Sequence, residues 1–331
     1  MTSKLNLLTD VEGVAVGHAT DLKLGSGVTA IVFDRPATAS GCVLGGAPGG
    51  RETALLDPSM AVEAVDAFVL SGGSAFGLDA AGGVQAGLRA IGRGFPVGDV
   101  KVPIVPQAIL MDLLNGGNKD WGLLSPYRDM GYDAFMAARD GAFELGSVGA
   151  GTGATTATFK GGLGSASAMT SGGHTVAAIA AVNAMGSATI GDGPFFWAAP
   201  FELDDEFGGI GLPANFSSPD TILRAKGINL TATTIGAVVT DAALTKAQTH
   251  RLSIMAHDGL ARAVLPAHLP ADGDTIFSAA TNRRPLASSA DFMELCHLAT
   301  LVMARAIARG VFEATSLPHE GAQASWRDRY G

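Results

Sequence analysis

Glycine interrupts short apolar runs over most of this chain, and that pattern limits the possible folds more than any other feature. The chain has 331 residues, of which 45 are glycine, whereas an average composition of ~7% would give roughly half that number. The glycines gather in tight turns and follow no fixed period, which excludes a collagen-like or low-complexity chain. The pattern therefore predicts a globular protein of short strands and helices joined by tight turns.

Apolar periodicity assigns the elements between these turns. Apolar and β-branched runs predict strands at residues 27–33, 67–70, 165–170, 174–182, 233–240 and 276–280. Helical spacing predicts helices at about residues 77–91, 127–141, 245–264 and 289–310. Two prolines favour an edge or loop position for residues 102–113, and the polar tail from Ser316 is expected to fray.

Size and charge restrict the class of protein. Nothing in the composition marks a boundary, so we expect one catalytic domain over residues 1–331. The formal charge of −9 argues against nucleic acid or an anionic membrane as a partner, because both require clustered Lys and Arg. The N-terminus has no basic-then-apolar signal pattern, and no apolar run reaches the ~18 residues of a membrane span. A cytoplasmic protein is expected.

Residues 232–241 are the most informative stretch for function. Residues 191–232 are rich in Pro, Gly, Ser and acidic residues, which predicts an irregular segment that buries little apolar surface. A structureless loop of this length in a compact domain is usually functional or a linker. An apolar strand follows it and opens with Thr233 and Thr234. We therefore hypothesise that the chain cuts itself between Ala232 and Thr233.

A cut at this bond would solve a chemical problem for a threonine nucleophile. The hydroxyl reacts poorly at neutral pH, but the α-amino group of an N-terminal threonine, with a pKa of about 7.7–8.0, can remove its proton. Ala232 offers little steric obstruction to attack on its carbonyl by the hydroxyl of Thr233. Two threonines also open strands for β-propensity alone, so other groups must support the hypothesis.

Four polar residues are candidates for the rest of an active site. Asp272 and Asp274 flank one glycine, so in an extended chain they share a face, where they could orient the hydroxyl and hold the amine of Thr233. Asn183 could donate its amide to an oxyanion, and Lys160 could tune the nucleophile. The alternatives are an Asp-Gly turn, a turn-forming asparagine and a lysine that reaches solvent. No metal is expected, because an EF-hand needs more oxygen ligands.

Two glycine-rich turns supply candidates for a substrate pocket. Residues 45–53 lack the Gly-Lys-Ser/Thr ending of a phosphate-binding loop, and residues 71–77 lack the GxGxxG spacing of a dinucleotide site. No cofactor is therefore expected. Phe76 is a candidate pocket residue, with core packing as the alternative. Asp79 is a candidate for holding a substrate ammonium, with surface or capping use as the alternative.

Eight segments together are more specific than any one motif. They include Pro-Gly-Gly-Arg-Glu-Thr, Ser-Gly-Gly-Ser-Ala-Phe-Gly and Asp-Gly-Asp-Thr-Ile-Phe, and they span residues 8–18, 48–53, 70–78, 148–153, 160–164, 182–186, 233–241 and 272–277. As a set they resemble the self-processing L-aminopeptidase/D-esterase family, which also contains β-peptidyl aminopeptidases and nylon-oligomer endo-hydrolases. The resemblance implies an α/β (α+β) fold, a four-layer α-β-β-α sandwich of the N-terminal-nucleophile type. It also implies self-cleavage into residues 1–232 and 233–331, which stay together.

The resemblance also implies roles for the candidate residues. By position, Thr233 is the nucleophile and Asn183 supplies the oxyanion contact. Asp272 and Asp274 match the acidic pair of the nylon-oligomer hydrolases, and Lys160 resembles their lysine near the nucleophile.

The chain departs from the nylon-oligomer hydrolases at two positions. Their tyrosine near the nucleophile falls close to Met111, which has no hydroxyl and is a candidate substrate-binding residue here. Ala232 stands where they have asparagine before the cut, so we expect processing at a different rate.

The function implied by the resemblance is hydrolysis of N-terminal residues from small peptides, amides or esters through a threonine acyl-enzyme. It further implies a homo-oligomer, a tetramer of two-chain units. Acyl transfer of the glutamate/ornithine N-acetyltransferase type is one alternative, since those enzymes also mature before a threonine. Nylon-oligomer (6-aminohexanoate) endo-hydrolysis is another. A non-enzymatic scaffold is the third, and the intact set of Thr233, Asn183, Asp272 and Asp274 argues against it.

Overall fold

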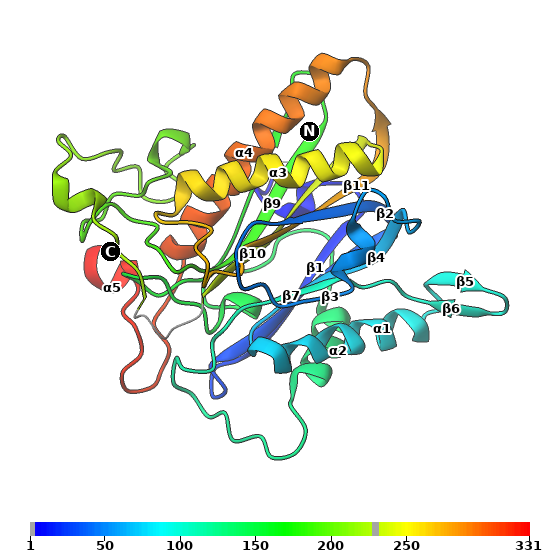
Figure 1. Ribbon diagram of the computed structural model, residues 1–331, viewed down its shortest axis with the longest axis horizontal. Helices are drawn as coiled ribbons and strands as arrows, with labels where there is room; N and C mark the ends of the chain where they lie inside the picture. The colour runs from blue at the N-terminus through cyan, green and yellow to red at the C-terminus, as the bar shows by residue number, and fades with distance from the viewer. Residues whose placement is uncertain (1–3, 227–231) are drawn as a thin grey trace.

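The computed structural model describes residues 4–226 and 232–331, and a mixed sheet forms its centre (Figure 1). Within the described chain the strands follow the order β3-β7-β4-β2-β11-β10-β9-β8, and β1 pairs with β2 outside this path. Their bounds are β1 Val14–Asp21, β2 Ser26–Val43, β3 Gly50–Arg51, β4 Ala64–Ser71, β7 Gln107–Ile109, β8 Leu163–Met169, β9 Thr175–Asn183, β10 Thr233–Ala243 and β11 Thr275–Pro285. A separate hairpin of β5 (Phe95–Val97) and β6 (Val100–Val102) projects from the body.

The three strands β9, β10 and β11 form the centre of the sheet next to the candidate site. β9 is antiparallel to β10, and β11 is parallel to β10. All of β9 and nearly all of β10 are buried, which explains why both sequences are continuous apolar runs without strict alternation. A parallel pair requires a crossover connection, and here α3 (Lys246–Ala263) provides it between β10 and β11.

Helices cover the sheet on two sides (Figure 1). On one side lie α3 and α4 (Ser289–Phe312), and on the other α1 (Ala80–Ala90) and α2 (Tyr127–Ala137). Thr245 and Ser288 start α3 and α4 by accepting hydrogen bonds from main-chain N–H groups in the first turn. Short 3-10 helices complete the chain: η1 Leu8–Asp10, η2 Thr53–Leu56, η3 Ser74–Asp79, η4 Gly149–Gly151, η5 Ala199–Phe201 and η6 Ser218–Thr221.

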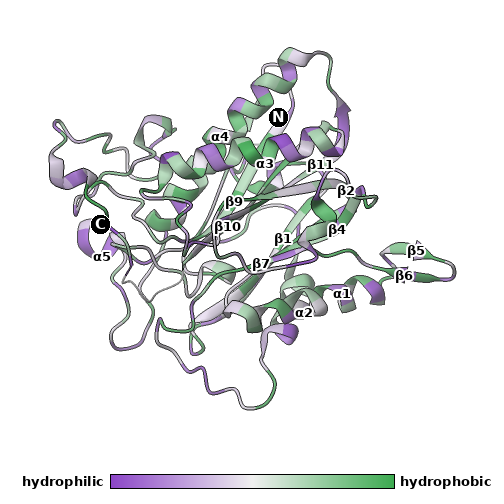
Figure 2. Cartoon of the chain, viewed as in Figure 1, coloured by the Kyte–Doolittle hydropathy of each residue, from purple (hydrophilic) through white to green (hydrophobic). Residues whose placement is uncertain are grey.

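The buried apolar side chains of the described residues form three separate cores. One lies between α3, α4 and the sheet and includes Val238, Leu260 and Met303. A second lies among the strands themselves and includes Ile31 and Ile235. The third packs α1 and α2 against β2 and β4. In Figure 2 the central strands are mostly hydrophobic or neutral, whereas hydrophilic residues gather on helix surfaces and outer loops.

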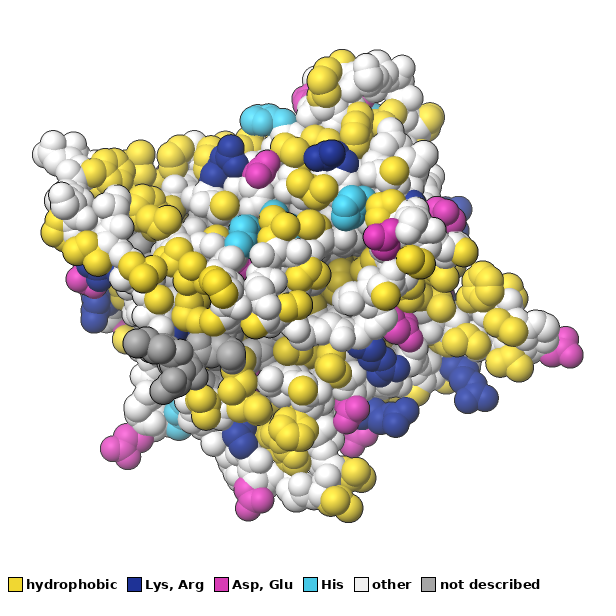
Figure 3. Space-filling view, in the orientation of Figure 1, with side chains coloured by type: hydrophobic (Ala, Val, Ile, Leu, Met, Phe, Trp, Pro, Cys, Tyr) yellow, Lys and Arg dark blue, Asp and Glu magenta, His cyan; other side chains and the backbone are white. Residues whose placement is uncertain are grey.

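The helix α4 belongs to the first of these cores. By length and hydropathy it could cross a membrane, but 72% of its most apolar window is buried inside the molecule. Its apolar character is therefore explained by packing against α3, β8 and β9. On the face drawn in Figure 3, charged side chains of both signs are scattered between hydrophobic ones.

The observed helices agree with the predicted ones within a few residues, but β2 is much longer than its predicted seven-residue strand. It continues past Asp34 to Val43, and its pairing with β4 shifts register between Val32 and Ala37. Pro36 lies in this interval and has no N–H to donate to β4, which explains the local loss of pairing. The point where the apolar pattern stops is therefore an irregularity inside one strand and not its end.

Two predictions about irregular segments are wrong. The tail beyond Ser316 does not simply fray: it ends in α5 (Trp326–Tyr330), and Trp326 is only 5% exposed. The segment from residue 191 does contain little regular structure, yet Phe196 and Phe207 are buried in the first core, with ring centroids 5.5 Å apart. Aromatic rings bury a large apolar area each, which compensates for the polar composition around them. The part of this segment at residues 227–231 lies outside the described residues.

We expect Gly164→Ala to destabilise the fold, because β8 and α4 touch there through their backbones. A Cβ at this position would lie 1.9 Å from the carbonyl oxygen of Ala306, and backbone atoms cannot move aside cheaply. The expected loss in free energy of unfolding is about 1–3 kcal/mol, measured by urea unfolding. Gly172→Ala is the matched control, since its nearest neighbours would lie at 3.6 Å. Equal stability of the two variants would contradict this packing.

Candidate active site

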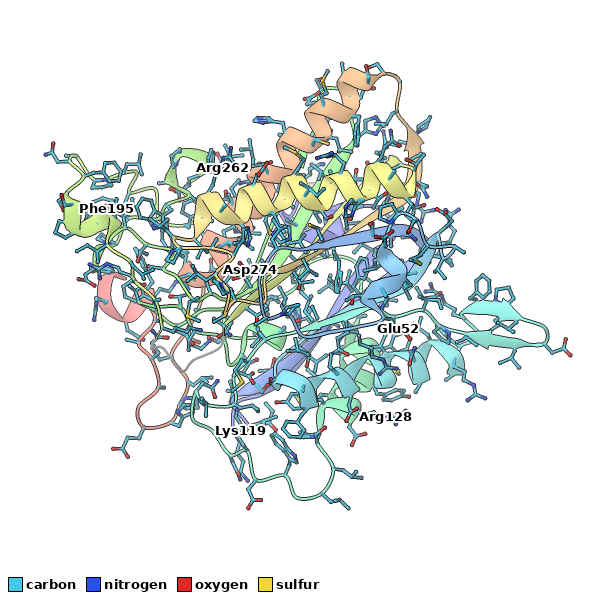
Figure 4. All side chains as sticks on the ribbon, viewed as in Figure 1. Glu52, Lys119, Arg128, Phe195, Arg262 and Asp274 are labelled. Atoms are coloured by element: carbon cyan, nitrogen blue, oxygen red, sulfur yellow. The ribbon has the colours of Figure 1, made fainter. Side chains whose placement is uncertain are left out.

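Strand pairing brings three candidate segments to one edge of the central sheet. Asn183 ends β9, and its antiparallel partner is Thr233, the first residue of β10. Asp272 pairs with Ala232 immediately before the parallel strand β11. β9 ends beside the start of β10 because the two strands are antiparallel, and β11 starts there as well because it is parallel to β10. Residues distant in sequence therefore become neighbours at this edge. Figure 4 shows Asp274 near the middle of the molecule, away from the outer loops.

The hydroxyl of Thr233 contacts the peptide bond that precedes it. Thr233 is 4% exposed, and its Oγ1 donates to the carbonyl oxygen of Ala232 at 2.5 Å. The N–H of Gly273 donates to the same oxygen at 2.9 Å. Gly273 must be glycine at this approach, since a Cβ there would lie 2.7 Å from Oγ1 of Thr233. The hydroxyl and a main-chain donor thus converge on one carbonyl group.

Asp274 anchors the backbone beside the nucleophile candidate. Its Oδ1 accepts the N–H of Thr234 at 2.9 Å. Its Oδ2 accepts the main-chain N–H of His268 at 3.0 Å and lies 2.8 Å from the Nδ1 of that ring. The carboxyl is almost fully buried, and these three contacts offset the cost of burying it.

Asp272 has a different environment from Asp274. It is fully buried, and its carboxyl makes no hydrogen bond of ordinary geometry to the residues that the structure describes. Burial, and then the nearby carboxyl of Asp274, raise the pKa of Asp272, while the charge of Lys226 opposes this shift. Asp272 therefore favours its protonated form over a wider pH range than an exposed aspartate does.

The acidic pair does not lie on the same side of the sheet as the Thr233 hydroxyl. The parallel register sets Thr233 beside Gly273, and side chains alternate between faces along a strand. Asp272 and Asp274 therefore share the opposite face. In the intact chain they flank the backbone around the nucleophile candidate, and the hydroxyl binds the carbonyl of Ala232 instead.

Asn183 is buried, and its side-chain amide is held at both ends. Its Oδ1 accepts the N–H of Thr155 at 3.0 Å and the ammonium of Lys226 at 2.9 Å. Its Nδ2 donates to the carbonyl of Met111 at 3.0 Å. Directly opposed residues on neighbouring strands lie close together on one face, so this amide is next to Thr233.

Lys160 is fully buried behind Asn183. Its ammonium donates to the carbonyls of Gly151 and Gly161 at 3.0 and 2.7 Å. Burial lowers the pKa of Lys160 to about 7, an effect that Asp112 opposes and Lys226 strengthens. Lys160 is linked to the site only indirectly: its backbone forms a β-bridge with Thr155, and the N–H of Thr155 donates to Asn183.

Lys226 is the functional candidate that sequence patterns missed. Besides Oδ1 of Asn183, its ammonium contacts the main-chain carbonyl of that residue at 3.1 Å. Burial lowers the pKa of Lys226 to about 7, and Asp272 opposes this shift. The available signal was weak: Lys226 is one of only two basic residues between positions 191 and 232, the other being Arg224.

A pocket of about 220 Å³ opens at Thr233. Its lining is mostly apolar, with two hydroxyl residues: Ala47, Pro48, Gly49, Ser74, Ala75, Leu78, Ile109, Met111 and Thr233 itself. Both glycine-rich turns therefore supply pocket walls. Met111 also separates this pocket from a second hollow of about 290 Å³ that Lys226 lines.

Phe76 and Asp79 do not line this pocket, although they are close in sequence to Ser74, Ala75 and Leu78, which do. The Phe76 side chain is 54% exposed and meets the edge of Trp121, with ring centroids 5.5 Å apart. Asp79 is exposed and accepts the hydroxyl of Ser125 at 3.2 Å. Within residues 4–226 and 232–331, no group of three or more His, Cys, Asp or Glu side chains is placed to hold a metal ion.

Comparison with known proteins identifies relatives along nearly the whole chain. The family model described as Peptidase family S58 matches residues 6–324. An uncharacterized aminopeptidase of Mycobacterium tuberculosis is 43% identical over 293 residues, which cover 84% of this chain and 82% of the relative. One from Mycobacterium leprae is 38% identical over 305 residues, with 88% and 83% covered.

Solved structures share the fold at low sequence identity. A β-aminopeptidase of Burkholderia superposes with a TM-score of 0.71 at 21% identity, covering 98% of this chain and 91% of that chain. The L-aminopeptidase D-Ala-esterase/amidase of Ochrobactrum anthropi, described as a variant of the Ntn hydrolase fold, gives 0.69 at 17% identity, covering 98% and 92%. The chain thus shares the mixed α/β fold of these two proteins.

We expect Asp272→Asn to stabilise the chain more at pH 8 than at pH 5. The pKa of the Asp272 carboxyl is higher in the folded chain than in the unfolded chain, so the free energy of unfolding falls as the pH rises from the lower pKa to the higher one. An amide does not ionise, so Asp272→Asn removes this loss of stability. The gain in free energy of unfolding at pH 8 should exceed the gain at pH 5 by roughly 2 kcal/mol. This difference between the two pH values is measured by urea unfolding in a Thr233→Ala background, in which the chain is expected to stay intact.

Asp99→Asn is the matched control for this measurement. Asp99 is exposed in the turn between β5 and β6, so its replacement should change stability equally at both pH values. A gain for Asp272→Asn that is the same at pH 5 and pH 8 would contradict the raised pKa.

Proposed function

This chain belongs to peptidase family S58, and we propose that it is a self-processing aminopeptidase with Thr233 as its nucleophile. The observation that carries the proposal is the contact of the Thr233 hydroxyl with the Ala232 carbonyl, beside a pocket that Thr233 lines. The fold of its structural relatives supports the same reading. We further propose the four-layer α-β-β-α arrangement, because three separate cores are the number that four stacked layers enclose.

Maturation begins with an attack by Thr233 on its own chain. Oγ1 adds to the carbonyl carbon of Ala232, and the N–H of Gly273 stabilises the negative charge that develops on the carbonyl oxygen. The C–N bond then breaks, and the hydroxyl proton is transferred to the departing nitrogen. Water hydrolyses the resulting ester, which leaves a carboxylate on Ala232 and a free hydroxyl and α-amino group on Thr233.

Turnover uses the same hydroxyl against a substrate. The α-amino group of Thr233 takes the hydroxyl proton as Oγ1 attacks the substrate carbonyl, and it then passes a proton to the leaving amine or alcohol. The Nδ2 of Asn183 donates to the oxyanion. Water attacks the acyl-enzyme, releases the acid and restores the hydroxyl.

The pocket restricts the substrate to a small group. Most of its lining side chains are apolar and its volume is about 220 Å³, which is below the ~300 Å³ of pockets for drug-sized ligands. We therefore propose that the acyl part of the substrate is a single small residue of a peptide, amide or ester. Asp272 lies buried beside this backbone on the β11 side, so its carboxyl belongs to the charged surroundings of the new α-amino group of Thr233.

We expect Thr233→Ala to remain a single chain, whereas the wild-type protein separates into residues 1–232 and 233–331. Hydrolysis of amino acid amides by the variant should fall on the order of 10³-fold or more, because the attacking oxygen is absent. Denaturing gels, intact mass and an amide hydrolysis assay measure both effects. Thr234→Val, which alters the adjacent buried threonine, is the control and should still be cut. A Thr233→Ala variant that hydrolyses amides at the wild-type rate would refute the proposal.

Replacing Gly273 should slow maturation specifically. In Gly273→Ala the new Cβ would lie 2.7 Å from both Oγ1 of Thr233 and the main-chain oxygen of Ala47, so the hydroxyl and the backbone that binds the Ala232 carbonyl must shift relative to each other. A shift of about 1 Å in a reacting group costs roughly 10²-fold in rate, so fragments should form about 10²-fold more slowly in a time course followed by mass. Gly172→Ala again serves as the control. Fragment formation at the wild-type rate in Gly273→Ala would show that the observed contact is not the reactive one.

A further inference from the structure

Lys226 is a half-buried cation that lies seven positions before Thr233 in the sequence. Its ammonium touches both oxygens of Asn183, Oδ1 at 2.9 Å and the main-chain carbonyl at 3.1 Å. Its own N–H donates to the carbonyl of Met185 at 3.0 Å, which holds its backbone against the chain that follows β9. An ammonium that is partly withdrawn from water needs polar partners, and here the side-chain partner is the candidate oxyanion donor.

These contacts decide which way the side-chain amide of Asn183 faces. The oxygen end lies among donors, the ammonium of Lys226 and the N–H of Thr155. The NH₂ end is therefore turned toward Met111, which lines the same pocket as Thr233. One N–H binds the carbonyl of Met111, and an NH₂ group has a second N–H to donate. A cation on the amide oxygen also polarises the group and strengthens its donors.

The main-chain contact of Lys226 lies beside the nitrogen of Thr233. The N–H groups of Ala232 and Thr234 point toward the side of β11, and successive N–H groups along a strand point to opposite sides. The nitrogen of Thr233 therefore faces its partner Asn183 on β9. The carbonyl of Asn183 on that side also receives the ammonium of Lys226.

We propose that Lys226 is a positioning residue for the reaction assigned to Thr233, an inference that rests on the proposed function. Its ammonium holds the amide of Asn183 with an N–H toward the oxyanion. It also places a positive charge beside the nitrogen that becomes the α-amino group of Thr233. A neighbouring cation favours the neutral form of an amine, which is the form that accepts the hydroxyl proton.

The other charged groups around this nitrogen set the sign of the expected effect. Asp272 and Asp274 lie on the β11 side, and Lys160 lies behind Asn183. Burial lowers the pKa of Lys226 to about 7, so Lys226 is charged in the acidic range where the amine becomes protonated. Without that charge the nearby carboxyls dominate, and they raise the pKa of the amine.

Glu320 is a further carboxyl in the surroundings of Lys226. It lines the same 290 Å³ hollow as Lys226, on the side of Met111 away from the Thr233 pocket. Its charge has the same sign as those of Asp272 and Asp274, so it does not change the expected direction.

The test compares Lys226→Met, which removes the charge, with Lys226→Arg, which keeps it. Lys246→Met is the control: the Lys246 ammonium likewise donates to main-chain carbonyls, but these belong to Leu55, Met60 and Val62, and the side chain is buried, at 4% exposure. Each variant is made in the full chain. Fragment formation, the urea midpoint, and kcat and KM against pH are measured with an α-amino acid p-nitroanilide.

Lys226→Met should lower kcat of the cut enzyme about 10–100-fold with little change in KM. The acidic limb of its kcat profile should move up by about one pH unit, because the amine is protonated more easily. Lys226→Arg should retain the position of the limb. Lys246→Met should lose stability only. In an Asn183→Ala background, Lys226→Met should reduce kcat much less than it does alone, because the two residues act through one amide.

If Lys226→Met stays uncut, the rate of fragment formation replaces kcat in this comparison, and Lys226→Arg must restore it. Wild-type kcat and an unmoved acidic limb in Lys226→Met would overturn the role of Lys226. The role of Lys226 would also be refuted if the loss of kcat in Lys226→Met were fully additive with the loss in Asn183→Ala and the acidic limb of the kcat profile did not move. The proposed function survives either outcome as long as Thr233→Ala is uncut and inactive.

Discussion

The pairing of β9, β10 and β11 is the constraint on which the site depends. Because β9 is antiparallel and β11 parallel to β10, Asn183, Thr233 and Asp272 meet at one edge of the sheet. A shift of one residue in either register would turn every side chain of β10 to its other face. The buried apolar run of β10 prevents that shift, since its apolar side chains pack into two different cores: Val238 and Ala242 into one, and Ile235, Ala237 and Val239 into the other.

Close packing around this edge explains both the glycines and the buried charges. Gly45 leaves no room for a Cβ, which would lie 2.3 Å from the main-chain nitrogen of Asp274, and Gly273 is similarly close to Thr233. Water is therefore excluded from Lys160 and Asp272 and partly from Lys226, and the pKa values of all three move toward the neutral forms. Buried ionisable groups are costly, and such groups gather where a reaction needs them.

Regular elements were predictable because their signals are local. Residues 233–240 and 245–264 have apolar patterns that specify a strand and a helix over a short range, and β10 and α3 occupy nearly those positions. The docking of Trp326 was not predictable, because its burial depends on contacts with Phe196 and Phe312, both distant in sequence. The length of β2 was missed for a related reason: long-range pairing continues the strand through a polar interruption.

The sequence by itself determined the family resemblance, the order of the elements and the chemical identity of Thr233, Asn183, Asp272 and Asp274, since these follow from residue types and short-range spacing. Only the tertiary structure decided which groups touch. It set the Thr233 hydroxyl on the Ala232 carbonyl, turned the acidic pair to the opposite face, and placed Lys226 on Asn183. The contacts of Asp272 and Lys226 join segments about 40 positions apart, and short-range sequence patterns carry no information on such pairs, so only the folded chain brings them together.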